Sequence, residues 1–334
     1  MTLTTRRPTG LPAWPILLIA GVEKSGKTYA AAAASASALV GRTLWVGVGE
    51  DDPDEYGAIP GARFEIVEHD GTYRGILGVL DECVTELAKT TKGDRPGLIV
   101  LDSATRLWNL LSDEAQEAAN RRARKKAQQN RKPEPEGDAT ISMDLWNLAK
   151  QRWDHVMDCL REHQGPSIVT ARLDLTSVVN DRGDPTPDRV WKVQAHKSLP
   201  YDVGAIVELP APGEAVLTGV RSLRVKNAQV ARRPFPQFTV EKLWTEMGLA
   251  ETSGPRRHTT SDAAASVTAD DRAAHTAQTL IAQIADLTQA KGIDPNVIVR
   301  DWMDSHNGQH IKDATDVGAL ELLRDDLAAK ETPA

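Results

Sequence analysis

The pattern that most constrains this chain is a short glycine-containing loop near its N-terminus. Residues 21–28 read Gly-Val-Glu-Lys-Ser-Gly-Lys-Thr, which matches G-x4-G-K-[ST] at every fixed position. The run 16–20 before it is apolar, as in a buried strand, and the run 29–40 after it is rich in alanine, a strong helix former. A loop between a strand and a helix aims backbone N–H groups and a helix N-terminus at an anion. The sequence therefore predicts a nucleoside triphosphate site.

Each part of this loop has an expected role. Gly21 and Gly26 let the backbone bend around the phosphates. Lys27 is expected to reach the β- and γ-phosphates, and the Thr28 hydroxyl to bind the Mg²⁺ that accompanies the triphosphate. The predicted cofactor-binding residues of the loop are Gly21, Val22, Glu23, Lys24, Ser25, Gly26, Lys27, Thr28 and Tyr29.

Two acidic residues complete the predicted site. Residues 98–103 read Leu-Ile-Val-Leu-Asp-Ser, an apolar strand that ends in Asp102. The carboxyl end of a buried parallel strand faces the ligand crevice, so Asp102 is predicted to hold the metal together with Thr28. Glu50 lies just past the predicted strand 43–48, where it could polarise the water that attacks the γ-phosphate. The alternative is that Glu50 belongs to a solvated acidic turn.

Strand-like and helix-like segments alternate from residue 16 to about residue 249, which indicates an α/β fold. We expect a mainly parallel sheet flanked by helices. The predicted strands are 16–20, 43–48, 98–101, 167–171, 205–209 and 222–226, and the clearest helices are 75–89 and 144–163. The length of 334 residues exceeds one average domain, so an appended unit is also expected.

The predicted organisation has four parts. Residues 1–13 are a flexible N-terminus, 14–249 the α/β domain, 250–271 a linker rich in Ser, Thr and Ala, and 272–331 a small helical domain. Three helices are expected in the last part, the third of them capped by Asp313. Trp302 stands within an apolar pattern, which indicates that it packs in the core of this unit.

Two polar stretches, 112–140 and 174–190, interrupt the alternation and are predicted to be long loops. Residues 121–132 hold seven basic residues and no acidic one, a cluster that could bind phosphates by releasing counterions. The alternative is a solvated helix face. The predicted nucleic-acid contacts are Arg121, Arg122, Arg124, Lys125, Lys126, Arg182, Arg189 and Trp191, with Trp191 available to stack on a base.

Taken in order, these elements resemble the core of RecA-type recombinases. RecA proteins carry G-P-E-S-S-G-K-T-T where this chain has Gly-Val-Glu-Lys-Ser-Gly-Lys-Thr-Tyr. Their next strand ends in an acidic element followed by Asp-Pro and a tyrosine, and here Glu50 is followed by 52–53, Asp-Pro, and by Tyr56. Their Walker B strand ends Val-Asp-Ser, and 101–103 reads Leu-Asp-Ser. The resemblance covers 14–235 and is closer to the phage RecA-like (AAA family) ATPases associated with single-strand annealing.

The resemblance implies a RecA-like P-loop ATPase that uses ATP and Mg²⁺. It implies Glu50 as the catalytic glutamate, Tyr56 as a residue that stacks on adenine, and Lys226 as a cation that reaches a neighbouring subunit's nucleotide. The loops 112–140 and 174–190 then correspond to the two DNA-contacting loops of RecA.

Two positions depart from the RecA pattern. The fourth core strand of RecA ends in a glutamine that couples the γ-phosphate to DNA, and here the arginine Arg172 follows 168–171. Arg172 either senses the γ-phosphate, as a guanidinium can, or stays exposed. The second trans lysine of RecA is replaced by Ala228. The predicted catalytic residues are Glu50, Lys27, Arg172 and Lys226.

The expected protein is an ATPase that acts on single-stranded DNA as a homo-oligomer, with nucleotide between subunits. A net charge of −7 limits any DNA contact to a local basic patch. The helical C-terminal unit is a candidate contact for a recombination or replication protein. The sequence has neither a membrane span nor a signal peptide, so we expect a cytoplasmic protein. Two alternatives stay open, a nucleotide-dependent assembly or loading factor with little turnover, and a P-loop small-molecule kinase.

Overall fold

The computed structural model describes residues 3, 5–89, 94–180, 184–226, 232–258, 263–306 and 308–329. The chain separates into two compact units, Met1–His258 and Thr259–Ala334, which are considered one at a time. The boundary falls after residue 258, inside the predicted linker 250–271. No helix in the described part of the chain combines the length and the apolar character that crossing a bilayer requires.

The first unit is built on a sheet whose central strands are parallel. The strand order is β3-β2-β4-β5-β1-β7-β8-β9, with β6 paired to the outer part of β5. The parallel strands are β1 (Ile16–Gly21), β2 (Thr43–Gly47), β3 (Phe64–Ile66), β4 (Leu98–Asp102), β5 (Ser167–Val179) and β7 (Ala205–Leu209). The antiparallel strands are β6 (Pro185–Gln194), β8 (Val216–Val220) and β9 (Arg233–Pro234). This architecture confirms the predicted α/β class with a mainly parallel sheet.

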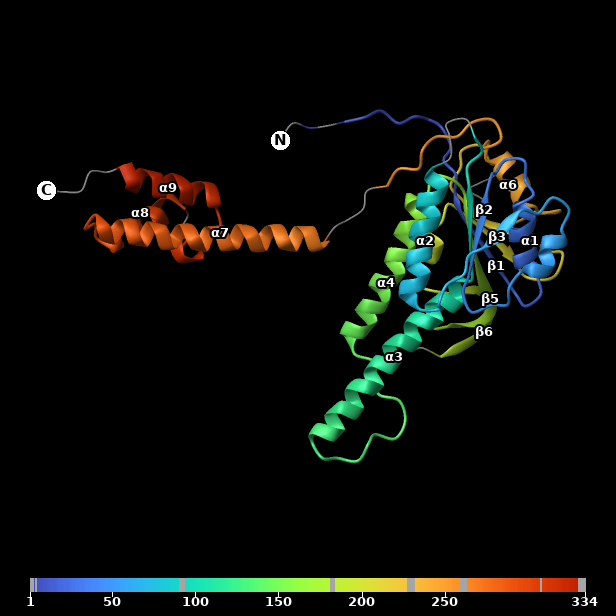
Figure 1. The fold of residues 1–334 in the computed structure, drawn as a ribbon, viewed down its shortest axis with the longest axis horizontal. Coiled ribbons are helices and arrows are strands. Elements are labelled where there is room, and N and C mark those ends of the chain that lie inside the picture. The colour runs from blue at the N-terminus through green and yellow to red at the C-terminus, as the bar shows by residue number, and fades with distance from the viewer. Residues whose placement is uncertain are drawn as a thin grey trace. The chain divides into compact units, whose positions relative to one another are not determined.

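Helices cover both faces of this sheet (Figure 1). On one face lie α2 (Tyr73–Ala88), α3 (Ala104–Gln129) and α4 (Met143–Glu162), and on the other lie α1 (Lys27–Ala34) and α6 (Val240–Glu246). The short helices η1 (Asp54–Ala58) and α5 (Leu199–Asp202) lie in connections. The side chains of strand β1 point alternately to the two faces of the sheet. Leu18 lies in the core under α2, α3 and α4, and Leu17 lies in the core under α1 and α6.

The prediction of a loop over 112–140 is wrong for most of its length. Helix α3 continues to Gln129, and Figure 1 shows its outer half running beyond the sheet with α4 beside it. We call this outer half, with the connection up to residue 142, the arm. Polar composition did not prevent a helix because the small side chains of Ala115 and Ala119 pack against Leu145 of α4. The ion pair between Arg122 and Asp144 (2.6 Å) adds a second tie between α3 and α4.

The predicted loop 174–190 is likewise mostly regular structure. β5 and β6 form an antiparallel hairpin whose register runs from Arg172 opposite Gln194 to Val179 opposite Pro185. The strand continues because apolar and polar residues alternate through Leu173 and Leu175, a pattern typical of a strand with two different faces. Arg182 lies outside the described residues.

The strand predicted at 222–226 is also wrong, because the strand after β7 is β8, six residues earlier. A tight turn closes with the Glu214 N–H donating to the Ala211 carbonyl (3.0 Å), and this turn sets the register of the β7–β8 hairpin. Strand pairing therefore starts directly after the turn.

The second unit is a small helical bundle. It contains α7 (Ala263–Ala290), α8 (Pro295–Ser305), η2 (Ile311–Asp313) and α9 (Val317–Ala329). Its core is lined by Leu280, Ile284, Trp302, Leu320 and Leu327. The predicted cap Asp313 lies in η2, and the residue that caps α9 is Asp316, whose Oδ1 accepts from the Ala319 N–H (3.1 Å). Asp313 is the last residue of η2, so the cap of α9 lies three residues later than predicted.

Residues 250–258 close the first unit through a buried arginine. The Arg256 guanidinium donates to the backbone carbonyls of Trp14 (2.7 Å), Leu160 (2.6 Å) and Gly165 (3.0 Å). Burial lowers the pKa of Arg256 to about 10, which still leaves the side chain charged near neutral pH. One side chain thus joins the segments before β1, at the end of α4 and before β5.

A buried histidine lies beside this arginine. His163 ends α4, and its Nε2 donates to the Gly97 carbonyl (2.9 Å) in front of β4. Burial is the main reason that the pKa of His163 falls to about 4, and the nearby charge of Arg256 lowers it further.

This histidine predicts that acid destabilises the fold. The folded imidazole stays neutral down to about pH 4, whereas an unfolded one takes up a proton near pH ~6.5, so the unfolded state binds more protons between these values. We expect this group to remove about 2 kcal/mol of unfolding free energy between about pH 7 and about pH 5. H163Q keeps a donor for the Gly97 carbonyl but does not titrate. Between about pH 7 and about pH 5 its unfolding free energy, measured with urea, should therefore fall by about 2 kcal/mol less than that of the wild type. Identical pH dependence in the two proteins would contradict the assignment.

Candidate functional site

The phosphate-binding loop has the geometry that its sequence predicts. Gly21 ends β1, and Gly26 takes a left-handed conformation (φ 92°) at the start of α1. The Ala30 N–H donates to the Gly26 carbonyl (2.9 Å) and so begins the helix. A Cβ on Gly21 would overlap the Ser25 hydroxyl, which donates to the Val22 carbonyl (2.8 Å). Glycine is therefore required at both ends of the turn.

Lys27 folds over this loop. Its Nζ donates to the carbonyls of Gly21 (3.0 Å) and Val22 (2.8 Å). Burial lowers the pKa of Lys27, and the carboxylates of Asp102 and Glu50 oppose that effect. The cation thus lies within the electrostatic reach of both acidic residues that the sequence singled out.

Asp102 and Thr28 lie together, as a shared metal site requires. The Thr28 hydroxyl donates to Asp102 Oδ2 (3.2 Å), and Thr170 of β5 donates to Asp102 Oδ1. Asp102 is 4% exposed. Burial raises the pKa of Asp102, while the hydrogen bonds from Thr170 and Thr28 lower it. A hydroxyl and a carboxylate side by side are oxygen donors of the kind that Mg²⁺ prefers, with waters filling its remaining positions.

Glu50 is held close to the same site by two hydrogen-bond donors and one longer ion pair. It follows Gly49 (φ 60°) after β2, and its carboxylate accepts from the Ser103 hydroxyl (2.9 Å). The Arg172 guanidinium donates to both carboxylate oxygens, at 3.0 and 3.1 Å. Arg106 lies farther off, with its Nε 3.9 Å from Glu50 Oε1. The side chain of Glu50 is 28% exposed, so it is only partly solvated.

Arg172 lies next to the phosphate loop in the sheet. It is paired in register with Gly21, and its backbone N–H donates to the Thr105 hydroxyl (2.9 Å). Ser103, Thr105 and Arg106 all belong to the start of α3. Our sequence reasoning missed Thr105, Arg106 and Thr170 as site residues. Their positions could have indicated them. Thr105 and Arg106 follow the predicted strand 98–101, and Thr170 lies near the end of the predicted strand 167–171.

Two tyrosines lie at the start of α1 and beside it. Tyr29 follows Thr28 and is exposed, and its ring centroid is 6.1 Å from that of Tyr56 in η1, nearly perpendicular to it. Glu23 and Lys24 of the loop are exposed and form an ion pair (3.6 Å).

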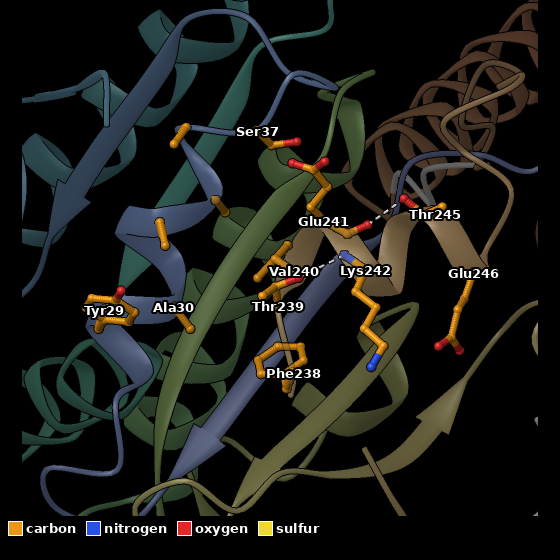
Figure 2. Close-up of a pocket in the computed structure, with 13 residues that line it drawn as sticks. Tyr29, Ala30, Ser37, Phe238, Thr239, Val240, Glu241, Lys242, Thr245 and Glu246 are labelled. Atoms are coloured by element: carbon orange, nitrogen blue, oxygen red, sulfur yellow. Dashed lines mark hydrogen bonds between the residues drawn. The ribbon is translucent and has the colours of Figure 1, made fainter. Parts of the chain in front are cut away.

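A groove of about 620 Å³ lies between α1 and α6 (Figure 2). Alanines of α1 line one side, and Phe238 and Lys242 lie on the α6 side, with Tyr29 at one end. Lys27 and Thr28 do not line this groove, so it is not the phosphate site.

The remaining predicted residues lie elsewhere. Arg121, Arg122, Arg124, Lys125 and Lys126 are exposed on the arm, and Arg189 and Trp191 lie on β6. Lys226 is exposed after the buried Val225. Ala228 lies outside the described residues.

No protein-family model matches the sequence, and no curated protein matches it. Among solved structures, the RadB recombinase has 20% identity over 64% of this chain and 84% of its own, with a TM-score of 0.33. The ATPase EscN of the type III secretion system of enteropathogenic E. coli has 16% identity over 95% of this chain and 67% of its own, with a TM-score of 0.33. A type III secretion ATPase of pathogenic bacteria has 15% identity over 95% of this chain and 80% of its own, with a TM-score of 0.31. Such weak likenesses assign no function.

The buried Asp102 predicts a trade-off between stability and metal binding. Because its pKa is raised, the folded state holds this proton more tightly than the unfolded state, and stability falls as pH rises through that range. D102N keeps partners for Thr28 and Thr170 without the charge. We expect its melting temperature without ligand to rise by about 2 °C at neutral pH, and its stabilisation by Mg²⁺ with ATP to be lost.

The matched control is D144N, which removes an exposed carboxylate whose pKa is lowered by Ser142 and Arg122. It should not raise the melting temperature and should keep the response to Mg²⁺ with ATP. A D102N protein that melts below the wild type and still responds to Mg²⁺ with ATP would contradict the metal assignment.

Proposed function

We propose that this chain is a RecA-like ATPase that binds and hydrolyses ATP with Mg²⁺ and acts on single-stranded DNA, in recombination or replication of the phage type. The observation that carries the proposal is the meeting of four side chains at one edge of the sheet. Lys27 and Thr28 begin α1, Asp102 ends β4, and Glu50 follows β2, and hydrogen bonds or electrostatic effects link all four. A phosphate loop beside two carboxylates is what triphosphate hydrolysis requires.

The proposed mechanism assigns one role to each group. The N–H groups of the loop and Lys27 would bind the phosphates, and Thr28 and Asp102 would hold Mg²⁺, which would supply positive charge to offset that of the phosphates. Glu50 orients a water and takes its proton as the water oxygen attacks the γ-phosphorus. The bond from that phosphorus to the β,γ-bridging oxygen breaks, and the ADP formed keeps that oxygen. Tyr56, beside Tyr29, offers an aromatic surface for the base.

The first test separates binding from hydrolysis. K27A should weaken ATP binding at least about 100-fold, because a buried cation that faces the phosphates is lost. E50Q should still bind ATP but hydrolyse it about 100- to 1,000-fold more slowly, because the group that accepts the proton is gone. Calorimetry measures the first effect and steady-state phosphate release the second.

The control for this test is K89A, which removes an exposed lysine paired with Glu86 on α2. It should match the wild type in both assays. Wild-type affinity in K27A would refute the phosphate site, and wild-type turnover in E50Q would move the base to another residue.

The same turnover assay distinguishes the rival functions. Turnover stimulated by single-stranded DNA supports the proposal. Slow, unstimulated turnover supports a nucleotide-dependent assembly or loading factor, and phosphate transfer to a metabolite supports a small-molecule kinase.

The arm and the β5–β6 hairpin are the proposed DNA contacts. Seven basic side chains of the arm are exposed, at 121, 122, 124, 125, 126, 131 and 132, and within the described part of the chain Arg122 is the one that forms an ion pair, with Asp144. Arg189 and Trp191 on β6 add a cation and an aromatic ring. Because both segments are regular elements here, we propose that they respond to ATP by moving as rigid pieces.

The DNA contact is tested through its salt dependence. R121Q/R124Q/K125Q removes three exposed charges of the arm and leaves the Arg122–Asp144 pair intact. Each phosphate contact in single-stranded DNA contributes about 0.7 to the slope of log affinity against log salt, so the slope should fall by about 2. Fluorescence anisotropy with a labelled oligonucleotide measures it.

A triple variant of exposed basic residues far from the arm in sequence, R74Q/K89Q/R95Q, has the same change in net charge and serves as the control. An equal drop in slope for both variants would mean that binding follows net charge and not the arm.

We also propose that ATP lies between subunits of a homo-oligomer. Lys226 supports this because it is exposed. A cation so placed is free to act on the nucleotide of a neighbour. The second unit, with Trp302 in its core, is the proposed contact for a recombination or replication protein.

A further inference from the structure

Glu50 and Arg172 form an ion pair that joins two parts of the proposed catalytic site. Both guanidinium bonds come from one nitrogen of Arg172 to the two carboxylate oxygens, at 3.0 and 3.1 Å. The Ser103 hydroxyl occupies Glu50 Oε1 as well, at 2.9 Å. A carboxylate with both oxygens engaged by donors has few lone pairs left to accept a proton from water.

Arg172 is placed to reach a γ-phosphate without any movement of the backbone. Its Cα lies beside Gly21 in the parallel sheet, one strand spacing from the first residue of the phosphate loop. Its N–H is fixed by Thr105, whereas its side chain is 45% exposed. Its charge also lowers the pKa of Lys27, so the two cations share one region. Rotation of the side chain alone can therefore exchange one anion for another.

We propose that Glu50 and the γ-phosphate compete for Arg172, so that a triphosphate, but not a diphosphate, withdraws the arginine and frees Glu50 to act on water. This inference rests on the proposed function. A guanidinium binds either a carboxylate or a phosphate through its N–H donors, and the γ-phosphate carries more charge than Glu50. The catalytic glutamate is thus released only when the bond to be broken is present.

Two further residues keep the released glutamate in place. The Ser103 hydroxyl stays bonded to Glu50, and Arg106 approaches it at 3.9 Å from the same turn of α3. The side chain of Arg106 packs over Gly49, where a Cβ would lie 3.3 Å from the Arg106 Cβ. Ser103 and Arg106 are positioning residues, because they act on the reaction through Glu50.

The competition is tested by comparing the affinities for ADP and for the non-hydrolysable analogue β,γ-imido-ATP. In E50Q the competing charge is gone, so the analogue should bind about tenfold more tightly than in the wild type, while the affinity for ADP should change less than about twofold. R172Q should weaken only the analogue. The double variant E50Q/R172Q should lose the gain of E50Q, because the arginine that transfers is absent.

The control is R42Q, which breaks the exposed two-bond pair between Arg42 and Glu65 (2.7 Å for each bond) away from the site. It should leave both affinities unchanged. An equal gain for ADP and the analogue in E50Q would overturn the proposal, because a general charge effect predicts it. No gain in E50Q, or a gain that persists in the double variant, would overturn it as well. A wild-type protein that binds neither nucleotide would refute the proposed function itself.

Discussion

The site depends on one buried charge and the two hydroxyls that bind it. Asp102 ends β4 inside the sheet, and it is tolerated there because Thr28 of α1 and Thr170 of β5 donate to its two oxygens. These bonds tie the loop 21–28, the proposed metal-binding carboxylate and the strand that leads to Arg172 into one arrangement. Burial raises the pKa of Asp102, so keeping this carboxylate charged inside the fold costs stability. Core packing alone would not require a carboxylate at this position.

The charges around this carboxylate are paired with one another. Glu50 is shared by Arg172 and Arg106, and Lys27 turns back onto carbonyls of its own loop. A triphosphate bound here would replace existing partners of these charged groups. Its net free energy of binding would therefore be smaller than the number of nearby cations suggests. The proposed competition for Arg172 would also distinguish a triphosphate from a diphosphate, because a diphosphate has no γ-phosphate to bind that arginine.

The sequence predicted the parts of the site that are local and missed those that depend on packing. The phosphate loop could be predicted because its glycines and Lys27 lie within eight residues and have only one workable geometry. Asp102 could be predicted because a buried parallel strand fixes where its last residue points. The helix over 112–129 could not, since its stability comes from Ala115 and Ala119 packing on α4, 30 residues away. The Glu50–Arg172 pair joins residues 122 positions apart and has no local pattern.

The position of that pair explains how distant segments can respond to a nucleotide. The first turn of helix α3 carries Ser103 and Arg106, which hold Glu50, and the whole helix, with its outer half in the arm, is 26 residues or about 39 Å long. Strand β5 passes Arg172 and continues into the hairpin that carries Arg189 and Trp191 on its other strand. Helix α3 and the β5–β6 hairpin, which carry the proposed DNA contacts, therefore both pass close to one ion pair. A change in that pair acts at the base of two rigid elements, and by reciprocity a ligand that shifts either element changes the affinity for the triphosphate.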